Sequence, residues 1–461
     1  MAREPVARKA LNAYQSSLDY LYRLEKFGMI FGLTQVERIL EALGNPHREL
    51  QVIHIGGTNG KGSTAAMMAS ILQHEGYRVG LYTSPHLIDF TERIRINGQE
   101  IEKEEVAELT SWMIERVNVA KITGPFTFFD FTTAMAFLYF SRKRVDLAIV
   151  EVGLGGRLDS TNVVDPLLSV ITNVSRDHED VLGRGILKIA GEKAGIIKKK
   201  RPVITAATQT GVLRLFSRVC QEKEAPLYRV GKEFRSTGSE TSDFTYQGLH
   251  RKLWSVHLNL RGLHQIVNAT TALGASEILE ELGFPVSTSA MVEGLQSVEW
   301  PGRFELVASS PRVILDGAHN PAGAVALRES LKEEFPDRRL ILLIGILKDK
   351  DFRTILRTLT PLADHVILSK PHLDRAAPVS LLEKALKENG KTVEAIEDLE
   401  EAIKRGLSLT GEEDLLCITG SLYMVGEAKA YFHPPTQKTT PACRNALRRA
   451  GTDSARGRRR P

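Results

Sequence analysis

The stretch HIGGTNGKGST, residues 54–64, decides the fold expected for this chain. A standard nucleotide-binding P-loop has a glycine, four further residues, and then Gly-Lys followed directly by Ser or Thr. Here an additional glycine, Gly62, separates Gly60-Lys61 from Ser63. The run LQVIHI (50–55) predicts a buried strand before the loop, and STAAMMASILQHEG (63–76) predicts a helix after it. A glycine-rich turn from a strand into a helix presents backbone N–H groups and the positive end of the helix dipole, so we expect a phosphate-binding loop.

The predicted phosphate site is a run of eight residues with complementary properties. They are Gly57, Thr58, Asn59, Gly60, Lys61, Gly62, Ser63 and Thr64. The small residues allow phosphate oxygens to approach the backbone, Lys61 supplies a positive charge, and the hydroxyl of Ser63 or Thr64 can bind Mg²⁺. The loop by itself predicts a phosphate ligand and names no reaction.

Apolar runs that alternate with helical patterns predict an α/β fold with a largely parallel sheet. Three more strands are expected at YRVGLYTS (77–84), DLAIVEVG (146–153) and LLSVITNV (167–174). Function gathers at the carboxyl ends of parallel strands. Ser84, Glu151 and the segment around His178 all follow such ends, so we expect them to converge on the glycine-rich loop.

The pattern along the chain predicts two domains. Residues 226–260 predict short antiparallel strands, and residues 264–283 predict a helix. The pattern breaks at Trp300-Pro301-Gly302, where a second α/β series begins. Its expected strands are RVILDGAH (312–319), RLILLIGI (339–346), HVILSK (365–370) and DLLCITGS (414–421). We therefore predict a phosphate-binding domain over residues 1–300 and a smaller Rossmann-like α/β domain over residues 301–433.

The composition is that of a soluble globular protein whose positive charge is concentrated at one end. No run among the 461 residues reaches the ~18 apolar residues that a membrane-spanning helix needs. Residues 434–461 carry a net charge of +7 against +5 for the whole chain, which leaves about −2 for the remainder. We interpret this segment as a disordered, solvated tail, and a nucleic-acid-binding arm is the alternative. The three cysteines are far apart, which favours a reducing cytoplasm over a disulfide framework.

Four polar residues near the loop are candidates for chemistry. Glu151 precedes three glycines, where its carboxylate can reach Mg²⁺ on a nucleotide; a capping or solvated glutamate is the alternative. Ser84 offers a hydroxyl ligand or merely a Ser-Pro turn, and His178 is a ligand or a packing residue. Lys193 lies beside the apolar run of KAGII, where burial would lower its pKa and favour a neutral amine. A neutral amine can react with CO₂ to form a carbamate, which would bind metal as a carboxylate does.

Further candidates lie at the predicted domain junction and beyond it. The segment HQIVNAT presents Asn268 and WPGRFE presents Arg303. The segment LDGAHNP presents Asp316, His319 and Asn320. A guanidinium group matches phosphate geometry, so Arg303 could clamp a γ-phosphate across a cleft; an interdomain salt bridge is the alternative.

Taken together, these motifs resemble those of folylpolyglutamate synthases and dihydrofolate synthases of the Mur-ligase superfamily. The resemblance runs in order from about residue 10 to about residue 430. Its motifs are GTNGKGST, LYTSPHL, ERIRING, EVGLGGRLDSTNVVDP, the DH, LG and IAGEKAGIIK segments, WPGRFE, LDGAHNPAG and TGSLYMVGE. The GTNGKGS form, with its additional glycine, belongs to this superfamily.

The resemblance implies an ATP-dependent ligase. ATP would phosphorylate a carboxylate, and the amine of L-glutamate would attack the acyl phosphate. By resemblance, Lys61 and the loop amides hold the phosphates, and two Mg²⁺ sites are expected. The first would use Ser63, Ser84 and Glu151, and the second Glu151, His178 and Lys193 as its carbamate. Asn268 and Arg303 would reach the ATP phosphates, and Asp316 and His319 the nucleoside side of ATP.

The resemblance also implies a pterin substrate, bound in part by an N-terminal region that the segment FGMIFGLTQVERILEALGNP matches. By resemblance, Thr127, Phe129 and Asp159 are its candidate contacts. Ser160 and the segment SRDHED depart from the commoner family pattern, so the sequence leaves open whether dihydropteroate, reduced folates or both are accepted. We expect a cytoplasmic, ATP- and Mg²⁺-dependent ligase that adds L-glutamate to dihydropteroate and to reduced folates. It is expected to be a monomer that uses small-molecule substrates and binds neither nucleic acid nor membrane. The alternatives are a folylpolyglutamate synthase without the second activity, a related Mur-type amino-acid ligase, and a P-loop switch protein.

Overall fold

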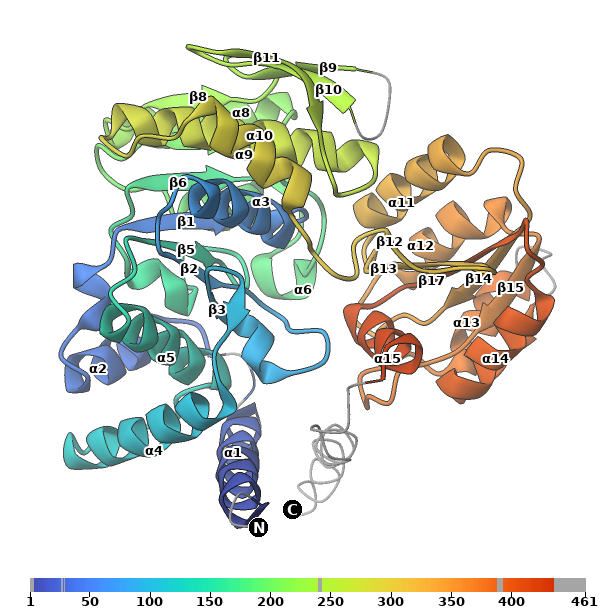
Figure 1. Cartoon of the computed structure of the whole chain (residues 1–461), viewed down its shortest axis with the longest axis horizontal. Helices are drawn as coiled ribbons and strands as arrows, with labels where there is room; N and C mark the ends of the chain where they lie inside the picture. The colour runs from blue at the N-terminus through green and yellow to red at the C-terminus, as the bar shows by residue number, and fades with distance from the viewer. Residues whose placement is uncertain (1–3, 26–27, 29, 239–242, 388–392, 435–461) are drawn as a thin grey trace.

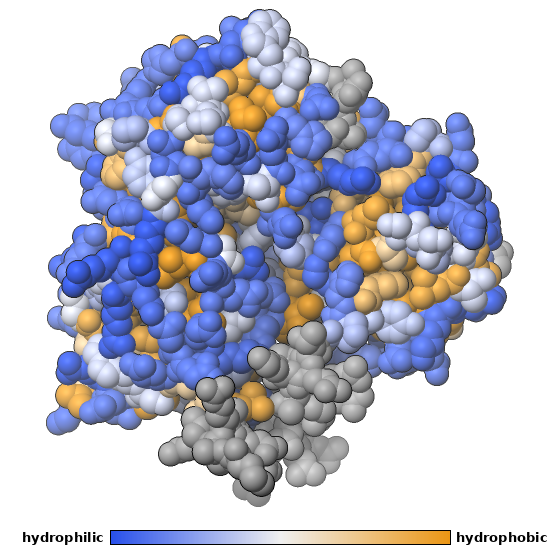
Figure 2. All heavy atoms as spheres, in the orientation of Figure 1, coloured by the Kyte–Doolittle hydropathy of each residue, from blue (hydrophilic) through white to orange (hydrophobic). Residues whose placement is uncertain are grey.

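The computed structural model describes residues 4–25, 28, 30–238, 243–387 and 393–434 as two lobes (Figure 1). The predicted basic tail lies outside the described residues from residue 435 onward. Figure 2 shows a mainly hydrophilic surface on both lobes, with a hollow where they meet. Among the described residues, no helix is both long enough and apolar enough to cross a membrane.

The first lobe is built on an eight-stranded sheet with the order β4-β3-β2-β5-β1-β6-β7-β8. The strand before the loop, β1, pairs in parallel with β5 and β6 at the centre of this sheet. The strands are β1 (Val52–Gly56), β2 (Val79–Tyr82), β3 (Ile94–Ile96), β4 (Gln99–Glu100), β5 (Leu147–Glu151), β6 (Leu168–Ile171), β7 (Val203–Thr205) and β8 (Leu227–Arg229). Only β3 and β4 at one edge are antiparallel, so the predicted largely parallel sheet is confirmed.

Two hydrophobic cores cover the two faces of this sheet. Alternate residues of β1 point to opposite faces, so Ile53 and Ile55 join one core and Val52 joins the other. The helices are α1 (Glu4–Leu24), α2 (Thr34–Ala42), α3 (Lys61–His74), α4 (Lys103–Val119), α5 (Phe128–Arg142), α6 (Glu179–Leu182), α7 (Ile186–Ala194), α8 (Thr210–Glu222), α9 (Leu263–Glu281) and α10 (Thr288–Ser297). Helix α3 packs against α9 and α10 and is buried on most of its surface, which fixes the glycine-rich loop at its start.

The prediction of antiparallel strands over residues 226–260 is partly wrong. Strands β9 (Arg235–Thr237), β10 (Asp243–Gln247) and β11 (Lys252–His257) do form a separate antiparallel sheet. Strand β8, however, pairs in parallel with β7 and extends the main sheet. Because β8 has only three residues, all of them half-buried, its short pattern did not identify its partner.

The second lobe contains a six-stranded sheet with the order β12-β13-β17-β14-β15-β16. All neighbours are parallel except β12 and β13. The strands are β12 (Glu305–Ser309), β13 (Arg312–Asp316), β14 (Leu340–Ile344), β15 (His365–Leu368), β16 (Glu394–Ala395) and β17 (Leu415–Thr419). The helices are α11 (Pro321–Glu334), α12 (Phe352–Leu359), α13 (Val379–Lys387), α14 (Leu399–Leu409) and α15 (Leu422–Phe432). Helix α6 of the first lobe and α11 of the second lie at the border between the lobes (Figure 1).

Candidate active site

The glycines of the phosphate loop are required by close backbone contacts. Gly57 and Gly60 have φ angles of 142° and 81°, which side chains rarely adopt. A Cβ atom on Gly60 would lie 2.4 Å from Oδ1 of Asn268. The loop therefore lies directly against α9, with no room for a side chain at this position.

The additional glycine, Gly62, is required by a different contact. It lies within α3, and a Cβ atom there would be 2.9 Å from Nε1 of Trp300. Trp300 is the residue at which the two predicted α/β series separate. Gly62 therefore lets the first turn of α3 pack directly against the segment that joins the two lobes.

Hydrogen bonding decides which loop amides remain free for a phosphate. The N–H of Thr58 donates to the carbonyl of Asn173 at 2.9 Å, and the N–H of Asn59 donates to Oδ1 of Asn173 at 3.0 Å. The N–H of Thr64 makes a helical bond to the carbonyl of Gly60 at 2.9 Å. The first four amides of a helix, counted from its N-cap, have no partner within the helix. The amides of residues 61–63, in the first turn of α3, are therefore available as donors to a phosphate.

Glu151 is a buried carboxylate at the carboxyl end of β5, as the sequence predicts. Its Oε2 accepts the N–H of Ser84 at 3.1 Å, and its Oε1 lies 3.9 Å from Nζ of Lys61. Burial raises the pKa of Glu151, and the charge of Lys61 opposes that rise. The structure thus brings Lys61, Ser84 and Glu151 together at the loop.

Lys193 lies on the other side of the loop and is 3% exposed. Its Nζ donates to the carbonyl of Gly57 at 2.8 Å. Burial, together with the nearby charge of Lys61, lowers its pKa to about 7. A substantial share of this amine is therefore uncharged near neutral pH, as the apolar neighbours in the sequence predict.

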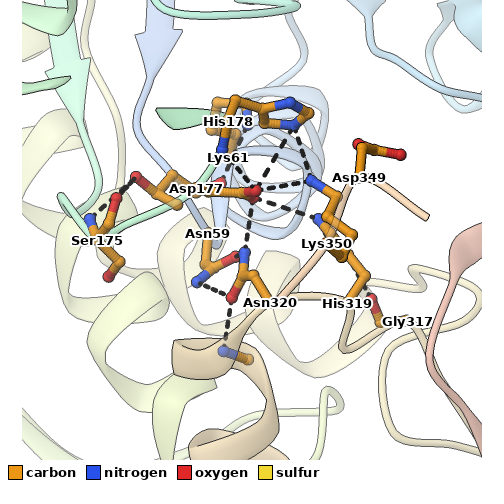
Figure 3. A network of polar contacts seen from close by, with 12 residues as sticks. Asn59, Lys61, Ser175, Asp177, His178, Gly317, His319, Asn320, Asp349 and Lys350 are labelled. Carbon is orange, nitrogen blue, oxygen red and sulfur yellow. Dashed lines mark hydrogen bonds and ion pairs between the residues drawn. The ribbon is translucent and has the colours of Figure 1, made fainter. Parts of the chain in front are cut away.

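A polar network in the cleft centres on Asp177 (Figure 3). Its Oδ1 accepts Nζ of Lys350 at 2.7 Å, and its Oδ2 accepts Nδ2 of Asn320 at 2.9 Å. Nε2 of His319 lies 3.7 Å from Oδ2. Burial alone would raise the pKa of the Asp177 carboxyl, but Lys350 and the two neighbouring histidines hold it well below its usual range. This carboxylate therefore binds one cationic and two neutral polar side chains of the second lobe, those of Lys350, Asn320 and His319.

His178 takes part in the same network. Its backbone is left-handed, with a φ of 51°, and its Nε2 lies 2.9 Å from Nζ of Lys350. Burial lowers the pKa of His178, and the charge of Asp177 partly offsets this effect. The neutral imidazole that results is the form that binds metals.

The predicted ATP-contacting residues occupy the border between the lobes. Nδ2 of Asn268 donates to Gln265 at 2.9 Å, and Arg303 donates to the carbonyl of Gly302 at 3.1 Å. Asp316 accepts the backbone N–H groups of Phe304 and Ala318, each at 2.9 Å. Asp316 therefore shapes the turn after β13, while His319 projects toward Asp177.

The three predicted pterin contacts lie around the glycines after β5. Thr127 caps α5 reciprocally with Asp130, and Asp159 accepts the N–H groups of Leu154 and Thr161. A Cβ atom on Gly153 would lie 2.6 Å from the ring of Phe129. Thr127 and Asp159 thus have structural roles here, and their predicted contact with a pterin stays a prediction.

The structure adds Asp177 and Lys350 to the predicted site, and it brings Asn320 of the predicted LDGAHNP segment to Asp177. Asp177 directly precedes His178, Asn320 directly follows His319, and Lys350 follows strand β14 at its carboxyl end. Their positions after strands were a usable signal. Their pairing was not, because Asp177 and Lys350 are 173 residues apart in the sequence.

These features define a class of protein: a two-domain, nucleotide-dependent enzyme whose phosphate loop and carboxylates face a second α/β domain across a cleft. The comparisons with known proteins agree with this class. Family models for the Mur ligase middle domain and the Mur ligase glutamate ligase domain match residues 55–276 and 302–422, respectively.

Three relatives match almost end to end. The dihydrofolate synthase/folylpolyglutamate synthase of Bacillus subtilis is 37% identical over 428 residues, covering 90% of this chain and 98% of the relative. A crystal structure of Mycobacterium tuberculosis folylpolyglutamate synthase with ADP and AMPPCP is 33% identical, with a TM-score of 0.86 over 92% of this chain and 100% of that one. The bifunctional synthase of Yersinia pestis with AMPPNP and a Mn ion is 31% identical, with a TM-score of 0.82 over 91% of this chain and 98% of that one.

The chain belongs to the dihydrofolate synthase/folylpolyglutamate synthase family of Mur ligases. It is an ATP-dependent acid–amino-acid ligase, and the predicted family, fold class and enzyme class are confirmed.

Proposed function

We propose that this chain adds L-glutamate to dihydropteroate and to reduced folates, using ATP and passing through an acyl phosphate. The observation that carries this proposal is the 37% identity that extends over 98% of a dihydrofolate synthase/folylpolyglutamate synthase. The phosphate loop, the buried carboxylate beside it and the cleft between the two domains support the proposal. Folylpolyglutamate synthesis without dihydrofolate synthesis is the alternative.

The chain's own residues serve this reaction by positioning and by charge. The amides of residues 61–63 and the ammonium of Lys61 would hold the nucleotide phosphates at the start of α3. Asn268 and Arg303 would approach the phosphates from α9 and from the domain junction, and Asp316 and His319 would approach the nucleoside side. Closure of the second domain would exclude water, which otherwise hydrolyses an acyl phosphate.

Mg²⁺ fits the buried residues beside the loop. A buried carboxylate is costly unless it is paired. In the part of the chain that the structure describes, Glu151 accepts one N–H, from Ser84, and Nζ of Lys61 lies 3.9 Å away. The hydroxyl of Thr64 is buried and has no hydrogen-bond partner in the described part of the chain. Ser63, Ser84 and Glu151 would hold a Mg²⁺ ion, which neutralises charge on phosphoryl oxygens when bound.

A second Mg²⁺ site at Glu151, His178 and Lys193 requires the carbamate. Within the described ranges, no three His, Cys, Asp or Glu side chains are grouped closely enough to hold a metal ion. A carbamate on Lys193 would supply the missing carboxylate-like ligand. The pKa of about 7 supports this modification, because CO₂ reacts with the uncharged amine.

The pterin would lie near Phe129, with Thr127 and Asp159 shaping the pocket wall. The ring of Phe129 stacks near Tyr82, with centroids 6.1 Å apart, and packs on the glycines after Glu151. An aromatic ring beside a phosphate site suits a flat heterocycle. The proposal also includes a cytoplasmic monomer that binds small molecules and not nucleic acid.

The experiment that tests this function follows ADP release from purified protein, with ATP, Mg²⁺ and L-glutamate. Dihydropteroate and tetrahydrofolate are added in separate reactions, and reactions without a pterin are the control. We expect pterin-dependent ADP in both. Activity with tetrahydrofolate alone would establish the alternative, and absence of activity with either would refute the proposal.

A further inference from the structure

The side chain of Asn320 uses its complete hydrogen-bonding capacity. Asn320 is 1% exposed, and its Oδ1 accepts the N–H of Gly323 at 2.8 Å and Nδ2 of Asn59 at 3.2 Å. Its Nδ2 donates to Oδ1 of Asn59 at 2.8 Å and to Oδ2 of Asp177 at 2.9 Å. A side-chain amide has two donor hydrogens and two acceptor lone pairs, so all four are occupied.

These four bonds also fix the orientation of the amide. The N–H of Gly323 needs an acceptor, and the ionised carboxylate of Asp177 needs a donor, so only one assignment of oxygen and nitrogen satisfies both. The same argument then orients the amide of Asn59. The two amides form a reciprocal pair across the domain border (Figure 3).

Asn320 therefore joins three segments that lie far apart in the sequence. It caps α11 of the second domain, bonds the phosphate loop through Asn59, and bonds the segment before α6 through Asp177. Lys350 adds an ion pair from the second domain to the same carboxylate at 2.7 Å. These contacts are specific in direction, unlike the apolar contacts elsewhere at the border.

We propose that Asn320 is a positioning residue of the ligation reaction: its amide clasps Asn59 and Asp177 and so sets the second domain in register with the phosphate loop. This inference rests on the proposed function, because the register matters when a phosphorylated carboxylate and an amine must meet inside a closed cleft. A misplacement of about 1 Å can lower a rate on the order of 100-fold.

The hydrogen bonds of Asn320 to Asn59 and Asp177, which we call the clasp, can be removed by a substitution that keeps the helix cap. Serine caps a helix about as well as asparagine, but its short hydroxyl cannot reach both partners. Asn320→Ser therefore keeps the cap of α11 and removes the clasp. Asp398 caps α14 in the same domain by accepting the N–H of Glu401 at 2.9 Å, so Asp398→Ser is the matched control.

The first test is a double-mutant cycle with Asn320→Ser, Asn59→Ser and the double variant. We expect Asn59→Ser to lower kcat for pterin-dependent ADP release about tenfold, and Asn320→Ser to lower it at least as much, because it also loses the bond to Asp177. The double variant should lower kcat no further than Asn320→Ser, because the Asn59–Asn320 pair is already absent there. The KM for the pterin and the melting temperature should stay close to wild type. Effects that multiply in the double variant, or a kcat for Asn320→Ser equal to that of Asp398→Ser, would overturn the proposal.

The second test measures domain register without turnover. Spin labels at Val119 and Leu381, which are 68% and 37% exposed, report the distance between the domains in the full chain with Cys443→Ser. With Mg²⁺ and a non-hydrolysable ATP analogue, the parent protein should give one narrow distance distribution, and Asn320→Ser a broader one. An unchanged distribution would overturn the clasp. Because this arm uses no pterin, it stays informative if the ligase assay fails.

Discussion

Replacing Lys193 by methionine should stabilise the fold in a pH-dependent way and abolish activity. Lys193 is 3% exposed, and within the described residues its amine donates one hydrogen bond, to the carbonyl of Gly57. Methionine fills a similar volume without an amine, so it removes the cost of a buried ammonium group. It also removes the amine that the proposed carbamate requires.

The size of this stabilisation follows from the pKa of Lys193 in the folded chain and in the unfolded chain. Burial lowers the pKa of Lys193 from 10.5 to about 7, which corresponds to about 5 kcal/mol. Between these values the unfolded chain holds a proton that the folded chain has lost, so the stability of the wild type rises with pH through this window. The protonation cost is about 3 kcal/mol at pH 8 and about 1.4 kcal/mol at pH 9.5.

The assay is urea unfolding of wild type and Lys193→Met at pH 8 and pH 9.5 in CO₂-free buffer. The stability advantage of the variant should shrink by about 2 kcal/mol between these pH values. Lys188→Met, at an exposed position of the same helix, is the matched control. A difference between wild type and Lys193→Met that does not change with pH would refute the buried-amine reasoning, and near-normal ligase activity of the variant would remove Lys193 from the mechanism.

Three further predictions follow from the site. Glu151→Gln should lower kcat on the order of 100-fold. Stability to urea should be unchanged or increased, because burial makes a charged carboxylate costly at this position. A kcat within about threefold of wild type would exclude a catalytic role for this carboxylate. Gly62→Ala should lower the free energy of unfolding by about 1–3 kcal/mol, because its Cβ atom would lie 2.9 Å from Trp300; a stabilised variant, as expected for alanine in an unobstructed helix, would contradict this packing. Truncation after His433 should leave ADP release unchanged, and loss of activity would assign the basic tail a function.

Much of the fold was predictable because it depends on local periodicity. The strand that becomes β1 is a short, fully buried run whose apolar residues are interrupted by His54, and the glycines after it predict the loop before α3. Lys193 is buried as its apolar neighbours predict. Strand β8 was assigned to the wrong sheet because three half-buried residues carry little periodic signal.

The interdomain part of the site was not predictable from the sequence. The pair Asn59–Asn320 joins residues 261 positions apart, and its geometry depends on how the second domain lies against the first. The same holds for Gly62, because the group that leaves no room for a side chain there is the indole of Trp300, which lies outside the loop. Local pattern identifies candidate residues, whereas their partners require the tertiary structure.

The measurement that tests the central claim most directly combines product mass with the fate of oxygen. Dihydropteroate labelled with ¹⁸O in its carboxylate is incubated with the protein, ATP, Mg²⁺ and L-glutamate, and mass spectrometry analyses the pterin product and the phosphate. The account predicts a product heavier by one glutamyl residue and ¹⁸O in the released phosphate, because the phosphorylated carboxylate oxygen leaves with phosphate when the amine attacks. A glutamyl product with unlabelled phosphate, or no glutamyl product, would contradict it.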